Sequence, residues 1–136
     1  MIYIRYLTKQ NRAILDIIEC ADDHMTAEEI YRRVRKVMPH ISVGTVYRNL
    51  NALSDEGSIR RISLPCGPDR YDRNVIPHGH LVCEMCGSVS DLFVEQVQSI
   101  IRETLGTECF SYELNVSALC EKCRRLATHD AERVLL

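Results

Sequence analysis

Apolar residues recur at every third or fourth position through the first part of the chain, which is the spacing of amphipathic helices. The pattern predicts a first helix that begins at Thr8 and ends before the polar residues 22–24. Thr26 and Glu29 have the spacing of a capping box, in which each side chain accepts a hydrogen bond from a backbone N–H at the helix start. They predict the start of a second helix, which Pro39 ends.

Ser42 predicts the cap of a third helix, which ends near Gly57. Two helices joined by a short turn make a helix-turn-helix, and residues 58–64 and 70–72 have the pattern of a hairpin that would follow it as a wing. The positions expected to face the core are Ala13, Ile14, Ile17, Ile18 and Ala21 in the first helix, Ile30, Tyr31, Val34, Val37 and Met38 in the second, and Val43, Val46, Tyr47, Leu50 and Leu53 in the third.

The second half of the chain changes to shorter elements. Residues 80–84 and 88–93 have the pattern of short strands around a Cys-x-x-Cys-Gly turn, and residues 94–105 that of a helix. Strict alternation of apolar and polar residues over 110–118 predicts a half-buried strand, and the segment beyond the last cysteine pair is a polar tail. We therefore predict an α+β chain with a winged helix at 1–73, a linker at 74–79 and a second domain at 80–136.

Composition and charge add three expectations. The formal net charge of −2 divides into +2 over residues 1–64 and −4 over residues 65–136, so a DNA-facing surface is expected in the first half. No apolar run approaches the length of a membrane helix, and no secretory signal is visible. These features favour a cytoplasmic protein without a membrane partner, in which the seven cysteines stay reduced as metal ligands or core residues.

The strongest chemical signal is a pair of Cys-x-x-Cys motifs, Cys83 with Cys86 and Cys120 with Cys123. Two such turns can direct four thiolates at one ion, the ligand set of tetrahedral structural zinc. Thirty-three residues separate the motifs, so a zinc ion would tie together the two ends of the second domain. The alternative is a pair of redox dithiols or core cysteines. A closed four-sulfur site has no open position, which indicates a structural role.

A second set of metal-binding residue types is scattered over both halves: His24, Asp72, His78, His80 and Asp91. Imidazole and carboxylate ligands suit Fe²⁺, Mn²⁺ or Zn²⁺. A metal that took ligands from both halves would fix their relative orientation. The alternative is that these are solvated loop histidines and surface carboxylates. In a strand, His78 and His80 could point to opposite faces.

The third helix and the wing carry side chains suited to DNA. Arginine can contact guanine edges or phosphates, asparagine can pair with adenine, and a helix N-terminus can hold a phosphate. The alternative is an ordinary solvated helix face and strand. The candidate DNA-contacting residues are Ser42, Thr45, Tyr47, Arg48 and Asn49 in the helix, with Arg60 and Arg61 in the wing.

Four segments together resemble the ferric uptake regulator (Fur) family, and most closely its peroxide-sensing branch, PerR. They are Ser42-Val-Gly-Thr-Val-Tyr-Arg-Asn-Leu50, Arg70-Tyr-Asp72, His78-Gly-His80-Leu-Val-Cys83-Glu-Met-Cys86-Gly87, and Cys120-x-x-Cys123. The resemblance covers residues 8–124. It departs from the family at Thr8-Lys-Gln-Asn11, where the family has Thr-Pro-Gln-Arg.

The resemblance implies a winged helix joined to an α/β dimerisation domain, a homodimer, and binding to a palindromic double-stranded DNA operator. It implies that the four cysteines hold structural Zn²⁺ and that the five histidine and aspartate residues hold a regulatory Fe²⁺ or Mn²⁺. The chain is then a transcriptional repressor of the oxidative-stress type, not an enzyme, and takes no small organic substrate.

Two positions indicate the branch. Asp91 matches the aspartate that peroxide sensors of the family usually carry where iron sensors carry glutamate, and Asp72 stands where zinc sensors tend to carry cysteine. The resemblance then implies that Fe²⁺ reduces hydrogen peroxide and that His24 or His78 is oxidised, which releases metal and DNA. The alternatives are an iron-status repressor, a metalloenzyme that activates water or peroxide, and a zinc-braced protein-interaction module.

Overall fold

The computed structural model describes residues 7–65 and 67–134, with side chains described as far as residue 130. The chain divides into two compact units, with the boundary between Val75 and Ile76, which lies inside the predicted linker. The predicted linker segment 74–79 also includes the first residue of a strand, Gly79. No helix in the described part of the chain is long and apolar enough to cross a membrane.

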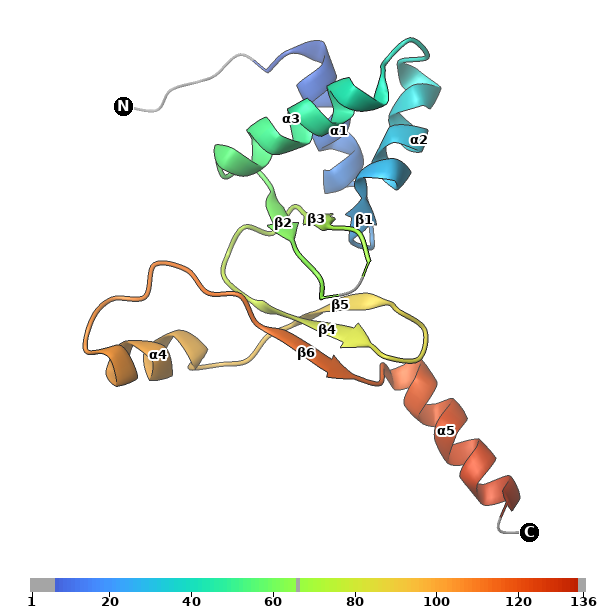
Figure 1. Ribbon diagram of the computed structural model, residues 1–136, viewed down its shortest axis with the longest axis vertical. Coiled ribbons are helices and arrows are strands. Elements are labelled where there is room, and N and C mark those ends of the chain that lie inside the picture. The colour runs from blue at the N-terminus through green and yellow to red at the C-terminus, as the bar shows by residue number, and fades with distance from the viewer. Residues whose placement is uncertain (1–6, 66, 135–136) are drawn as a thin grey trace. The chain divides into compact units, whose positions relative to one another are not determined.

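Three helices form the first unit, as the hydrophobic pattern predicts (Figure 1). They are α1 (Lys9–Glu19), α2 (Ala27–Val37) and α3 (Val43–Asp55). Each begins after a side-chain cap, because Thr8, Thr26 and Ser42 each accept a hydrogen bond from a backbone N–H in the first turn. The capping box predicted at Thr26 and Glu29 is present in both directions. The sequence therefore predicted where each helix begins.

A small sheet completes the first unit. Its strands are β1 (Met25–Thr26), β2 (Arg60–Ile62) and β3 (Arg70–Asp72), in the order β1-β3-β2 with both pairings antiparallel. Strands β2 and β3 form the predicted wing, although the first is shorter than the predicted segment 58–64. Strand β1 was not predicted, because two residues are too few to show an alternating pattern.

The core of the first unit comes from one face of each helix, closed by Met25, Ile59 and Tyr71 from the sheet side. Three predicted core positions are wrong: Val37, Val43 and Tyr47 are 68%, 47% and 47% exposed. On α3 the buried stripe runs through Val46, Leu50 and Leu53, and Tyr47 lies one residue, about 100°, away from Val46. Val43 is the first residue of α3 and lies at the end of the helix, beyond the buried stripe. Val37 is the last residue of α2, and Met38 packs partly against the core in its place.

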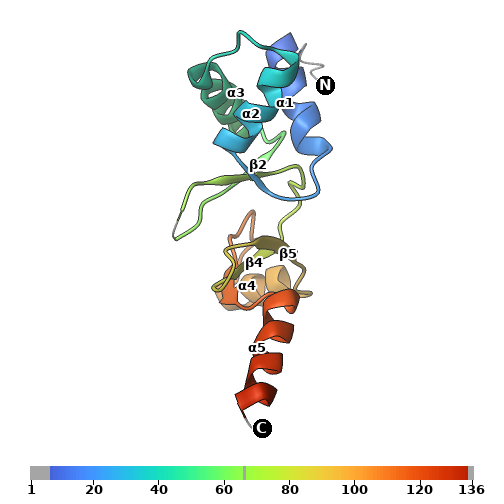
Figure 2. The ribbon, with the colours of Figure 1, turned by 90° about the vertical axis from the view of Figure 1, so that its right-hand side faces the viewer.

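The second unit is built on a three-stranded sheet in the order β5-β4-β6. Strand β4 (Gly79–Cys83) pairs antiparallel with β5 (Val89–Leu92) and parallel with β6 (Asn115–Ala118). Helix α4 (Val97–Leu105) is part of the connection from β5 to β6, and α5 (Glu121–Val134) follows β6. Figure 2 shows α5 extending away from this sheet.

Three predicted boundaries in the second unit are corrected. Helix α4 begins at Val97 and not at 94, because Gln96 adopts a left-handed backbone with φ of 69°. Strand pairing is confined to 115–118, and Phe110 is 92% exposed although it starts the predicted strand. The polar tail contains helix α5, whose side chains are mostly exposed over the described positions.

The second unit buries few apolar side chains. Among its described residues, the buried side chains are His78, His80, Cys83 and Cys123. Large apolar side chains are exposed at Ile76, before β4, and along α4 and the segments that flank it in sequence, namely Phe93, Val94, Ile100, Leu105 and Phe110. Over its described side chains, this unit therefore has no aliphatic core comparable to that of the first unit.

Candidate metal centres and nucleic-acid interface

The sulfur atoms of the two Cys-x-x-Cys motifs all lie within 4.8 Å of one another. Cys83 ends β4, and the parallel pairing of β4 with β6 places Cys83 opposite Ala118, two residues before Cys120. Cys123 lies in the first turn of α5. The thirty-three residues between the motifs thus bring the second cysteine pair back beside the first. The sequence required this if both pairs were to bind one ion. The Sγ atoms of Cys86 and Cys120 are 3.8 Å apart, far longer than a disulfide bond.

Local hydrogen bonds favour the thiolate form at the first motif. The backbone N–H of Cys120 donates to Cys83 Sγ at 3.3 Å, and this bond is the main cause that lowers the pKa of Cys83 to about 6. A hydrogen bond with Ser88 lowers the pKa of Cys86. Gly87 follows the turn with φ of 73°, which a glycine adopts without strain.

Cys123 of the second motif shows the opposite tendency. Burial and the adjacent sulfurs raise the pKa of Cys123 to about 12. Four thiolates at this spacing repel one another unless a cation lies between them. The donor set and its closeness fit Zn²⁺, which takes four cysteine thiolates in structural sites. This four-cysteine cluster confirms the zinc-site part of the predicted fold.

The second unit also carries a histidine and aspartate group on neighbouring strands. His80 and Asp91 are partners in the β4–β5 register, with His80 Nε2 3.6 Å from Asp91 Oδ1. His78 Nε2 lies 3.0 Å from the same oxygen. His78 precedes β4, so the alternation of a strand does not separate it from His80, and their ring centroids are 4.6 Å apart.

Two contacts orient the ring of His78. Its Nδ1 lies 2.6 Å from the carbonyl oxygen of Ile76. Because a carbonyl oxygen can only accept a hydrogen bond, Nδ1 carries the proton in the neutral ring, and Nε2 has the lone pair. The ring also stacks on Phe93 at 5.3 Å. A hydrogen bond from the distal nitrogen to a carbonyl is the usual support of a metal-binding histidine.

Gly79 between the two histidines is required by close packing. A Cβ atom there would lie 3.1 Å from a side-chain carbon of Leu114 and 3.2 Å from the carbonyl oxygens of Leu114 and Leu92. Only glycine fits between the neighbouring segments without a shift. The His-Gly-His sequence therefore brings both imidazoles to Asp91.

The first unit contributes a separate pair, His24 and Asp72. His24 precedes β1 and Asp72 ends β3, and the pairing of Met25 with Tyr71 brings the two residues together. His24 Nε2 lies 3.7 Å from Asp72 Oδ2, and the other carboxylate oxygen accepts a hydrogen bond from the backbone N–H of Asn74 at 2.9 Å. The pair consists of one imidazole and one carboxylate, without sulfur.

Arg70 and Arg73 hold the loop that carries His24, a role that the sequence did not predict. Arg70 Nη1 donates to the carbonyl oxygen of His24 at 2.7 Å, and Arg73 donates to the carbonyl oxygen of Glu19. Both bonds join residues far apart in the chain, so no periodic pattern could reveal them. They tie the turn after α1 to strand β3.

Ser42, Thr45, Arg48 and Asn49, four of the five DNA-contacting residues predicted for this helix, form a hydrogen-bonded chain at the N-terminal end of α3. Ser42 Oγ and Thr45 Oγ1 are 2.9 Å apart, and Arg48 Nη2 donates to Thr45 Oγ1 at 3.0 Å. Asn49 Nδ2 donates to the carbonyl oxygen of Thr45 at 2.7 Å, so its amide is directed back to its own helix. The Tyr47 side chain is half exposed.

Comparison with known proteins identifies the family of this chain. The model of the "Ferric uptake regulator family" matches residues 5–117. The peroxide-responsive repressor PerR of Staphylococcus aureus (strain USA300) is 31% identical over 121 residues, which cover 87% of this chain and 82% of that protein.

Solved structures show the same fold. The Campylobacter jejuni peroxide stress regulator has a TM-score of 0.75 and 28% identity, with 84% of this chain and 88% of that chain covered. The Helicobacter pylori ferric uptake regulator Fur also has a TM-score of 0.75, at 22% identity, with 87% and 81% covered, and supports the fold alone. The predicted resemblance and the predicted fold class are confirmed. This chain belongs to the ferric uptake regulator family.

Proposed function

We propose that this protein is a metal-dependent, DNA-binding transcriptional repressor that responds to peroxide. The observation that carries the proposal is the separation of two kinds of metal ligand. Four thiolates gather at one place, while the histidine and aspartate groups of both units contain no sulfur. The first set suits a structural zinc ion, and the second suits an exchangeable Fe²⁺ or Mn²⁺.

The proposed regulatory ligands are His24 and Asp72 from the first unit with His78, His80 and Asp91 from the second. The support lies in the donor chemistry within each unit, where imidazole nitrogens lie 3.0 to 3.7 Å from carboxylate oxygens. These five side chains would together hold the ion. When bound, Fe²⁺ supplies the electron that reduces hydrogen peroxide. The backbone carbonyl of Ile76 and the ring of Phe93 keep the ring of His78 oriented toward Asp91, where it would bind the ion.

Asp91 supports peroxide sensing rather than iron-status sensing, since the iron sensors of the family usually carry glutamate at the matching position. The S. aureus relative bears the name peroxide-responsive repressor. An iron-status repressor is the second candidate within the same class. Both candidates assign regulation and not catalytic turnover to this chain.

The DNA-binding surface in this proposal is helix α3 with the wing. Helix α3 begins after the Ser42 cap, and the backbone N–H groups at a helix N-terminus can bind a phosphate. The bond from Arg48 to Thr45 holds that guanidinium in place before DNA arrives, which lowers the entropy cost of binding. The proposed contacts are Ser42, Thr45, Tyr47, Arg48 and Asn49 from the helix and Arg60 from the wing.

The second unit is the proposed homodimer interface. Helix α4 has no buried residue, and Ile100 and Leu105 are 57% and 64% exposed. Large apolar patches of this kind mark interaction surfaces in soluble proteins. Two copies joined there would present two α3 helices to the half-sites of a palindrome. Sedimentation of the Ile100→Asp variant tests this, with a dimer expected for the parent and a monomer for the variant.

Mass spectrometry after peroxide treatment tests the peroxide assignment. Protein loaded with zinc and then with Fe²⁺ is expected to gain one oxygen atom on the peptide of His24 or His78 and to release a duplex selected from a random-sequence library. Protein loaded with Mn²⁺ should keep both its mass and its DNA. The peptide of His40, which is no proposed ligand, is the internal control.

The possible results separate the candidates. Fe²⁺- and Mn²⁺-dependent DNA binding without histidine oxidation favours the iron-status repressor. Continued consumption of peroxide over many turnovers favours a metalloenzyme. Failure to bind any duplex with metal loaded favours a zinc-braced interaction module.

A further inference from the structure

We propose that Arg61 is a positioning residue that braces the wing against helix α3, and does not serve as a phosphate contact. The inference rests on the proposed DNA-binding function, because the wing matters only if this face binds DNA. It replaces the sequence-based expectation for Arg61, which treated both wing arginines alike.

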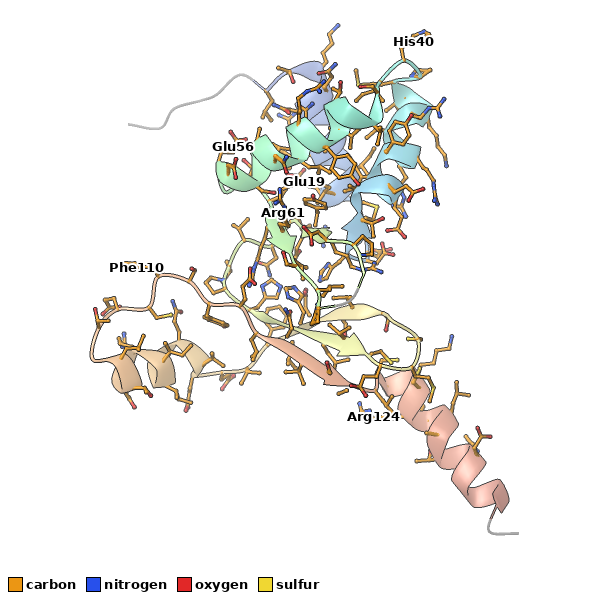
Figure 3. The ribbon with its side chains drawn as sticks, viewed as in Figure 1. Glu19, His40, Glu56, Arg61, Phe110 and Arg124 are labelled. Carbon is orange, nitrogen blue, oxygen red and sulfur yellow. The ribbon has the colours of Figure 1, made fainter. Side chains whose placement is uncertain are left out.

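The guanidinium of Arg61 contacts three different segments of the first unit. Its Nη2 donates to Oδ1 of Asn51, in the second half of α3. Its Nε lies 3.9 Å from Oδ2 of Asp69, in the wing turn. Its central carbon lies 6.0 Å from the centre of the Tyr71 ring, on the neighbouring strand β3. Figure 3 shows the labelled Arg61 beside β2, beneath α3.

The strand register explains this position. Arg61 is paired with Tyr71 in the antiparallel β2–β3 register, and Tyr71 is only 4% exposed. The side chain therefore leaves the hairpin on the face that carries a buried ring, and from there it reaches α3. Neighbouring strand residues point to opposite faces, so Arg60 leaves the hairpin on the other side.

A brace is useful here because the hairpin is short. Strands β2 and β3 have three residues each, so few backbone hydrogen bonds determine how the wing is directed relative to α3. Arginine suits this role because its planar group carries five donors in a fixed geometry. The Asp69 carboxylate beside the guanidinium offsets part of its charge, and the bond to Asn51 occupies one of its donors. Both contacts weaken its attraction for phosphate.

The two roles predict different behaviour for the partner residue. Asn51 is exposed on α3 and uncharged, so its removal cannot reduce the number of cations near DNA. If Arg61 is a brace, Asn51→Ala should affect DNA binding through the same mechanism as Arg61→Gln. If Arg61 contacts phosphate, the two substitutions should act independently.

A double-mutant cycle tests this on the Mn²⁺-loaded, zinc-containing full chain. The parent, Asn51→Ala, Arg61→Gln and the double variant are titrated with the tightest duplex that the parent selects from a random library. Each single substitution is expected to weaken binding about tenfold, and the double variant should bind no more weakly than the weaker single variant. Multiplied effects in the double variant would overturn the inference.

The salt dependence of binding gives the second readout. A lost phosphate contact lowers the slope of log affinity against log salt by about 0.9, whereas a lost brace leaves the slope nearly unchanged. Arg48→Gln is the control for a lost contact at the DNA surface. An Arg61→Gln slope that falls as much as that of Arg48→Gln, with Asn51→Ala silent, would show that Arg61 contacts phosphate.

Hydrogen exchange without DNA gives a third readout, which does not depend on the proposed function. Amides of Arg60–Ile62 and Arg70–Asp72 should exchange faster in Arg61→Gln and in Asn51→Ala, while the buried part of α1 should not change. Unchanged exchange in both variants would overturn the brace. A parent protein that binds no duplex would refute the proposed function, while this measurement would still decide the brace.

Discussion

The Cys123→Ser substitution tests how much of the second unit depends on zinc. Cys123 is buried and supplies one of four converging sulfurs. A serine hydroxyl is a poor ligand for Zn²⁺, so the ion is expected to be lost. Without it, the second unit has two buried histidines and one buried cysteine but no buried aliphatic side chain among its described residues.

The expected size of the effect follows from this lack of a core. Structural zinc contributes on the order of 10 to 16 kcal/mol in small zinc domains, which equals or exceeds the whole stability of a typical domain, about 5 to 15 kcal/mol. The second unit of the variant should therefore be unfolded in the absence of denaturant. The first unit has its own core, with twelve buried residues among those described, and should remain folded.

Urea unfolding measures this directly. The urea m-value scales with the surface exposed on unfolding, and the first unit contains 75 of the 136 residues. The variant's m-value should fall to about 55% of the parent's, with proteolysis confined to the second unit. Cys109→Ser, which changes a cysteine of the same unit outside the cluster, should keep the parent's zinc and m-value. A Cys123→Ser protein with the full m-value would refute the reasoning.

Three further predictions concern the core, the loop of His24 and the thiolates. Leu50→Ala should lower the free energy of unfolding by about 2 to 5 kcal/mol, since Leu50 is fully buried; a loss below about 1 kcal/mol in urea titration would contradict the assigned core. Arg70→Ala should weaken Mn²⁺ binding about tenfold, because it removes the donor to the carbonyl of His24, while zinc content stays unchanged; calorimetry showing equal Mn²⁺ affinity would exclude this support. Zinc retention should fall as the pH decreases. The pKa of Cys83 is lowered to about 6, chiefly by the backbone N–H of Cys120. A group whose pKa is lowered in the folded state stabilises that state above this pKa, and the stabilisation is lost as the pH falls through it. Transfer of zinc to a colorimetric chelator that proceeds equally at about pH 8 and about pH 5 would contradict this expectation.

The helices of the first unit illustrate how far local patterns reach. Thr26 and Ser42 cap their helices as predicted, and the first helix begins at the predicted Thr8, because capping depends on residues within one turn. Core assignments were less accurate at Tyr47, which lies one residue from buried Val46, and at Val43, the first residue of α3, because one step along a helix or a place at its end can turn a side chain to the solvent. Strand β1 and helix α5 were missed, because the first is too short and the second too polar for periodicity to reveal them.

The sequence by itself determined the chemistry of the metal ligands. Two Cys-x-x-Cys motifs and a His-Gly-His segment specify which donor atoms are present, and their type limits the metals they suit. Tertiary structure decided which donors meet. The parallel pairing of β4 with β6 brings the second cysteine pair to the first, and the β4–β5 register brings Asp91 to His80.

The role of the arginines also belongs to the tertiary structure. Arg60 and Arg61 look equivalent in the sequence, and only the strand register directs Arg61 toward Tyr71 and Asn51. Likewise, Arg70 meets the carbonyl of His24 across 46 positions in the chain. Local patterns reflect the backbone geometry of a few neighbouring residues, whereas such contacts arise only when distant segments are packed together.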